Sequence, residues 1–115
     1  MDYGMPTGTQ RDFLEKLMRA AEPGLATALQ SQCDGALIAA EEHCTVCFQL
    51  KIANRNVRVP RNLGNPLSYD AVLSGKEREA VQVLLWHEGG YVESVEIGWV
   101  GDEHPKLEDI DLESR

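Results

Sequence analysis

The chain has 115 residues, and its 11 lysine and arginine residues against 19 aspartate and glutamate residues give a formal net charge of −8. A chain of this length suits one domain with its own hydrophobic core, so we expect residues 1–115 to form a single domain. Its apolar runs are far shorter than the ~20 residues of a membrane-spanning helix. A negative surface also repels phosphate backbones and anionic lipid headgroups, which argues against nucleic-acid and membrane partners and favours a basic protein partner.

The N-terminal segment Met1–Thr9 is polar, contains glycine and proline, and lacks the basic start and apolar run of a secretion signal. We therefore expect a cytoplasmic protein. Residues 1–8 show no periodicity, and we expect them and residues 113–115 to be mobile.

Two helices are predicted in the first third of the chain. Thr9 resembles an N-cap because Asp12 follows three residues later, and apolar residues then recur at helical spacing: Phe13, Leu14, Leu17, Met18 and Ala21. Pro23-Gly24 ends this helix. The leucine spacing in Leu25–Gln32 predicts a short second helix.

The middle of the chain predicts strands and one long loop. Gly35–Glu41 is a short apolar stretch that we interpret as a strand, and Thr45–Ile52 alternates between apolar and other residues as a strand does. Val57–Val59 alternates again before a proline, which predicts a short edge strand returning along the preceding one. Arg61–Glu79 contains many turn residues and is predicted to be mostly loop.

The strongest structural signal is a β-hairpin near the C-terminal end. Two apolar stretches, Ala80–Trp86 and Tyr91–Val100, flank Glu88-Gly89-Gly90, where glycine permits positive φ. We expect Tyr91, Glu93, Val95, Ile97 and Trp99 to share the face that packs on the first helix. The predicted architecture is α+β, with one or two N-terminal helices on a mainly antiparallel sheet of about four strands.

Cysteine and histidine are the only metal-ligating residue types that cluster. The cluster consists of Cys33, His43, Cys44 and Cys47. The Cys44-x-x-Cys47 spacing would allow two thiolates to reach one zinc ion, or would suit a redox pair. No second paired motif accompanies it, and Cys47 falls in the apolar pattern of a strand, so structural thiols are the favoured interpretation. Three cysteines also argue against a disulfide framework.

No catalytic motif is present, so we expect neither enzymatic activity nor a cofactor. His87 beside Glu88 could form an acid–base pair, but a histidine at a hairpin end is usually an exposed titrating group. Glu93 and Glu96 point to opposite faces of a regular strand, so without a bulge they cannot flank one substrate. Trp86 and Trp99 are expected to be core residues, and the alternative is a contact surface on which aromatic and charged groups combine.

The segment Trp86–Ile97, followed by the turn Gly-Asp-Glu-His-Pro, resembles a segment of small acidic bacterial proteins. The stretch Leu25–Phe48 resembles the first half of the same proteins. Such proteins include the immunity proteins of bacterial toxin systems, notably contact-dependent growth inhibition, which bind a cognate toxin domain in the cytosol and block its active site. The resemblance implies a non-enzymatic binding protein with a toxin as partner. It identifies no contact residues, because immunity surfaces differ between toxin pairs.

Acidic residues on or just beyond the hairpin are the predicted contact residues. They are Glu93, Asp102, Glu103, Glu108 and Asp109. Complementary charge would draw in a partner that is basic at the contact. Three alternatives remain: the acidic end serves only solubility, the interface lies on the basic segment Lys51–Arg61, or the protein is a small metal-binding or enzymatic domain that uses the cysteine–histidine cluster.

Overall fold

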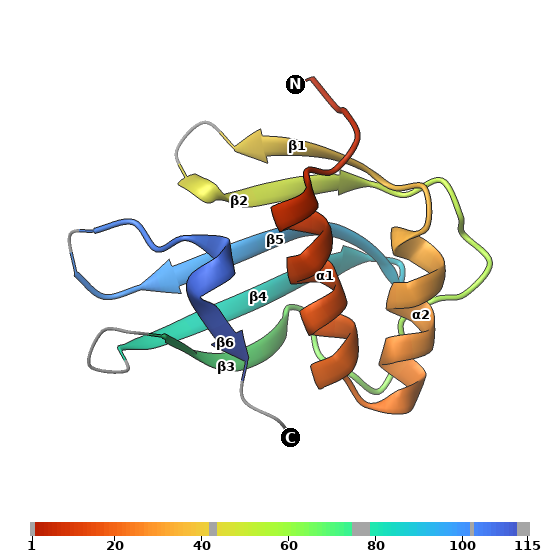
Figure 1. Cartoon of the computed structure of the whole chain (residues 1–115). Helices are drawn as coiled ribbons and strands as arrows, with labels where there is room; N and C mark the ends of the chain where they lie inside the picture. The colour runs from red at the N-terminus through yellow and green to blue at the C-terminus, as the bar shows by residue number, and fades with distance from the viewer. Residues whose placement is uncertain (1, 42–43, 75–78, 102, 113–115) are drawn as a thin grey trace.

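Two helices cover one face of an antiparallel β-sheet (Figure 1). The computed structural model describes residues 2–41, 44–74, 79–101 and 103–112. The elements are α1 (Gly8–Ala20), α2 (Pro23–Cys33), β1 (Leu37–Glu41), β2 (Cys44–Lys51), β3 (Leu67–Leu73), β4 (Ala80–Glu88), β5 (Tyr91–Trp99), the 3₁₀ turn η1 (Leu107–Asp109) and β6 (Ile110–Leu112). Within the described residues the sheet has six strands in the order β1-β2-β5-β4-β3-β6. The α+β prediction is confirmed, and the expected four strands are too few.

A capping box fixes the start of α1. Gln10 N–H donates to Thr7 Oγ1 over 3.1 Å, and Thr7 N–H donates to Gln10 Oε1 over 2.9 Å. This reciprocal pair satisfies two main-chain donors at once, which makes Thr7 the N-cap. The prediction that Thr9 caps the helix was therefore wrong by two residues.

The apolar stripes of both helices face the sheet, as their spacing predicted. Phe13, Leu14 and Leu17 of α1 are buried, as are Leu25 and Leu29 of α2. Proline occupies the first turn of α2, where its missing N–H removes no intrahelical hydrogen bond. Each helix thus contributes one apolar face to a core that the sheet completes.

The strand β3 lies in the segment that we expected to be loop. Its burial alternates perfectly, with Leu67, Tyr69, Ala71 and Leu73 buried in the core. β3 pairs with β4 on one side and with β6 on the other. The prediction that Arg61–Glu79 is mostly loop missed this strand, because turn residues flank its alternating pattern on both sides.

The segment Val57–Val59 is not a strand, so the predicted edge strand was wrong. Both edges of β2 are already occupied, by β1 and by β5. Val59 N–H instead donates to the carbonyl oxygen of Gly90 over 2.8 Å. The segment is therefore held against the turn of the β4–β5 hairpin.

The predicted hairpin is present, and it contains a β-bulge. Gly89 and Gly90 form its turn with φ of 61° and 89°. Trp86 pairs with Ser94 and His87 with Val92, which leaves Glu93 as the extra residue of β5. Val92 therefore joins the core of the helix-covered face, and the expectation that Tyr91 shares that face with Val95 was wrong.

Packing of α1 on the sheet can be tested at Leu17, whose side chain is 1% exposed. Leu17→Ala should lower the free energy of unfolding by about 2 to 5 kcal/mol, because it removes buried methyl groups and leaves a cavity. Denaturant titration measures this change. Met5→Ala is the control, since Met5 is 73% exposed and its truncation should cost little. Equal small effects of both substitutions would contradict the packing.

Candidate functional site

The structure divides the predicted contact acids between two ends of β5. Glu93 lies in the bulge at the hairpin end. Glu103 and Asp109 border a hollow of about 600 Å³ beyond the other end of the strand, which we call the tail hollow. Glu108 is exposed on η1, and Asp102 lies outside the described residues. The four acids that the structure describes therefore do not form one continuous patch.

Hydrogen bonds to main-chain carbonyl oxygens hold the η1 turn in place. Lys16 Nζ donates to the carbonyl oxygen of Ile110 over 3.2 Å. The carbonyl oxygen of Asp109 accepts from Ser74 N–H over 2.8 Å and from Ser74 Oγ over 3.2 Å. These bonds use carbonyl oxygens, so they fix the turn without engaging the carboxylates of Glu108 and Asp109.

The sheet face turned away from the helices, which we call the uncovered face, carries an exposed tryptophan. Trp86 is 38% exposed, so the interpretation of this residue as core was wrong. Strand register places Glu96 beside Leu84, and Asp70 beside Gln82, on the same face. Trp99 is half-buried, and its ring lies 4.8 Å from that of His104. The uncovered face thus combines one large aromatic side chain with exposed acids.

Two arginines and a tyrosine contact one another at the hairpin end. The guanidinium carbon of Arg55 lies 3.9 Å from the centroid of the Tyr91 ring, and that of Arg58 lies 5.6 Å from it. Arg58 Nε donates to the Tyr91 hydroxyl over 3.2 Å, and this hydroxyl donates to the carbonyl oxygen of Arg55 over 3.0 Å. We call these three residues the arginine–tyrosine cluster.

Two carboxyl groups meet beside this cluster. A hydrogen bond to Glu88 raises the pKa of Glu93, and desolvation and the negative charge of Glu88 raise it further. A hydrogen bond between two carboxyl groups requires a shared proton, which explains the direction of the shift. On a regular strand Glu93 and Glu96 would point to opposite faces, so only a bulge could bring Glu93 into a carboxylate pair. The bulge is present, but Glu93 bonds to Glu88 and not to Glu96.

One buried glutamine holds this end of the molecule together. Gln32, at the end of α2, has no exposed surface. Its Nε2 donates to the carbonyl oxygens of Val57 and Gly90, both over 2.8 Å. Its Oε1 accepts from Val92 N–H over 2.8 Å. No local sequence pattern marks Gln32 as a structural residue, because its partners lie far along the chain.

His87 is held in the structure and is not a free surface group. Asn65 Nδ2 donates to the carbonyl oxygen of His87 over 2.6 Å, and His87 N–H donates to Asn65 Oδ1 over 3.1 Å. The imidazole Nε2 lies 3.1 Å from the carbonyl oxygen of Gly64. The ring therefore fastens the loop before β3 to the hairpin, and the expected exposed position was wrong.

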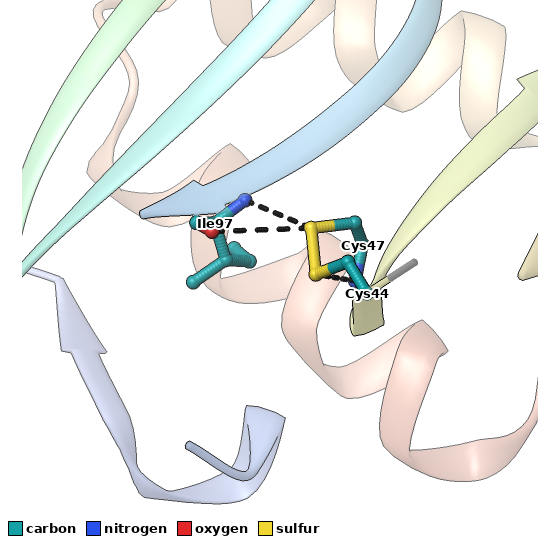
Figure 2. Close-up of a disulfide and its surroundings, with 3 residues drawn as sticks. All are labelled: Cys44, Cys47 and Ile97. Carbon is teal, nitrogen blue, oxygen red and sulfur yellow. Dashed lines mark hydrogen bonds between the residues drawn. A yellow bond between two sulfur atoms is a disulfide. The ribbon is translucent and has the colours of Figure 1, made fainter. Parts of the chain in front are cut away.

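A disulfide joins Cys44 and Cys47, whose Cα atoms lie 5.2 Å apart. Figure 2 shows how the bridge meets β5: Ile97 N–H donates to Cys47 Sγ over 3.4 Å. The sulfur accepts a hydrogen bond that a main-chain carbonyl would accept in a regular ladder. The interpretation of these two cysteines as structural thiols was wrong, because the irregular start of β2, where the β1–β2 register shifts, brings their Cα atoms within bridging distance.

Cys33 is a free thiol at the end of α2. Burial raises its pKa to about 11. The helix α2 and the start of β2 lie at opposite ends of the sheet (Figure 1). His43 lies outside the described residues, and the part of the chain that the structure describes contains no group of three or more metal-ligating side chains. A metal site on Cys44 and Cys47 would first require reduction of their disulfide.

Comparisons with known proteins add no relative. No protein-family model matches the chain, and neither a curated protein nor a solved structure matches it. Among the described residues no helix is long and apolar enough to cross a membrane. We therefore infer function from the geometry of the uncovered face and of the hairpin end.

Gln32→Leu should lower the free energy of unfolding by about 2 to 4 kcal/mol, since it leaves two carbonyl oxygens and one N–H without their partner. Chemical denaturation measures the loss. Gln82→Leu is a matched control, because Gln82 is exposed and its amide bonds only the Ser68 hydroxyl. We expect the control to change stability by no more than about 0.5 kcal/mol. A similar cost for both variants would refute the role of Gln32.

The side-chain carboxyl of Glu93 should titrate above the ordinary glutamate pKa of about 4.3. Because the native state binds this proton more tightly than the unfolded chain, stability should rise as the pH falls through the pKa of Glu93. NMR titration of the carboxyl carbon measures the midpoint, and Glu88→Gln should lower it by removing the neighbouring negative charge. A midpoint at or below the ordinary value in the unsubstituted protein would disprove the pairing.

Proposed function

We propose that this protein is a non-enzymatic binding module that neutralises a cognate bacterial toxin domain, and that the toxin docks on the uncovered face. The observation that carries the proposal is the exposed Trp86, which lies among acids on a face that no helix covers. Tryptophan is one of the residues most enriched at the centres of protein interfaces. An exposed tryptophan on a rigid strand is therefore a suitable anchor for a partner.

Charge supports a basic partner. Asp70 and Glu96 are exposed on the uncovered face, and the whole chain carries a net charge of −8. Complementary potentials accelerate association and select against partners of the wrong sign. The acids outside this face, including Glu93, Glu103, Glu108 and Asp109, would add to the long-range attraction without touching the partner.

The dimensions of the molecule also suit a stable interface. Its two longer principal extents are 41 and 33 Å, which leaves room for the ~800 Å² that each partner buries in a standard protein complex. The face consists of paired strands, so little conformational entropy is lost on binding. Immunity requires only that this surface cover the active site of the toxin, and the resemblance of Trp86–Ile97 to such proteins favours that class.

The test uses the polypeptide encoded directly upstream of this gene, because an immunity gene follows its toxin gene. Its C-terminal domain should arrest growth when it is expressed alone, and co-expression of this chain should restore growth. The two purified proteins should also form a complex. Failure of the upstream domain to arrest growth, or failure of this chain to relieve the arrest, would reject the proposal.

Substitutions on the two sides of the molecule test the docking face. Trp86→Ala should weaken binding by about 2 kcal/mol, or roughly 30-fold, and Glu96→Lys should slow association with the basic partner. Glu15→Lys makes the same charge change on an exposed position of α1 and is the control. Calorimetry and stopped-flow association at two salt concentrations provide the measurements. If Glu15→Lys impairs binding as much as Glu96→Lys, the partner does not use the uncovered face.

A further inference from the structure

Basic residues concentrate at one place in this acidic chain. Lys51, Arg55, Arg58 and Arg61 fall within eleven consecutive positions that contain no acid. In the structure this segment follows β2 and passes the end of the β4–β5 hairpin, where Val59 bonds to Gly90. The hairpin end therefore brings these basic residues together, next to the acids Glu88 and Glu93.

The two central arginines lack a carboxylate partner. Arg55 and Arg58 form no ion pair with any residue that the structure describes, although the chain contains 19 acids. Both guanidinium groups instead lie against the ring of Tyr91. Guanidinium groups that are stacked on an aromatic ring keep donors available for an external oxyanion.

The arginine–tyrosine cluster is also held in position before any ligand arrives. The Tyr91 hydroxyl bonds to Arg58 Nε and to the carbonyl oxygen of Arg55. Gln32 fixes the neighbouring Val57 and the turn residue Gly90. Less side-chain entropy is then lost when the arginines bind a ligand.

A hollow lies in front of this cluster. It has a volume of about 560 Å³, and its lining includes Lys51, Arg55, Arg58, Glu88, Tyr91 and Glu93. Arg58 also borders a second hollow of about 320 Å³ together with Arg61 and Asn65. Volumes of this size accommodate a side chain or a short peptide segment.

We propose that the arginine–tyrosine cluster binds a carboxylate side chain from an acidic peptide segment of a protein partner. The planar guanidinium group matches a carboxylate through two parallel hydrogen bonds. Glu88 and Glu93 also line the hollow and, together with the net charge of −8, oppose a long polyphosphate backbone. A single carboxylate carries only one negative charge, so it meets less repulsion from these two acids. This site is distinct from the uncovered face and does not depend on toxin binding.

The experiment uses an N-acetylated hexaglutamate peptide and follows the Arg Nε–H signals of the ¹⁵N-labelled protein by NMR. The peptide should shift the signals of Arg55 and Arg58 in a saturable manner. The double substitution Arg55→Gln/Arg58→Gln should weaken binding about 10-fold or more. The matched control Arg11→Gln/Arg19→Gln removes the same charge from exposed positions of α1 and should change the affinity less than about 2-fold.

A second variant is expected to increase the affinity for the peptide. A misfolded protein would not bind more tightly, so this result cannot be explained by a loss of folding. Glu88→Gln/Glu93→Gln removes the negative charge of the carboxyl pair, which repels an anion, and should tighten peptide binding about 3-fold or more. The proposal is overturned if the peptide causes no saturable shift, if both arginine pairs affect binding equally, or if the glutamate substitutions leave the affinity unchanged. It is also overturned if inorganic phosphate shifts the Arg55 and Arg58 signals while the peptide does not.

Discussion

The side chain of Gln32 is the interaction on which the hairpin end depends. Its three hydrogen bonds connect α2 with Val57, with the turn at Gly90 and with Val92 of β5. A buried amide is tolerated only when its donors and acceptor are satisfied, so these bonds also fix the distance between the helix and the sheet. The position of Arg55 and Arg58 relative to Tyr91 follows from this arrangement.

The sequence predicts correctly those elements whose signals lie within a few neighbouring residues. The leucine and phenylalanine spacing of α1 and the glycine pair of the hairpin are local, and both predictions hold. The strand β3 was not predicted, because turn residues flank the segment in which buried and less buried residues alternate. The bonds of Gln32 span 58 and 60 residues, and no pattern within one element encodes partners so distant. The bulge at Glu93 likewise has no sequence signature, although it decides which side chains enter the core.

The two faces of the sheet differ in what they can do. On one face the helices bury the apolar side chains, and this burial supplies most of the driving force for folding. The other face carries side chains that the core does not require, including Trp86, Asp70 and Glu96. The predicted contact acids that the structure describes lie towards the two ends of β5, whereas Arg55 and Arg58 lie together at the hairpin end. Different parts of the surface therefore favour different partner chemistry.

The connection between β2 and β5 is narrow. Among the described residues, only Phe48 with Val95 and Gln49 with Ser94 pair across it, and the Cys47 sulfur accepts a hydrogen bond from Ile97 N–H beside them. The strands β1 and β2 therefore form a two-stranded arm attached to a four-stranded sheet by a short seam. Phe48 and Leu50 of this arm are nevertheless buried in the same core cluster as Val83 and Val95 of the larger part. Apolar burial therefore holds the arm in place where the hydrogen-bonded ladder is short.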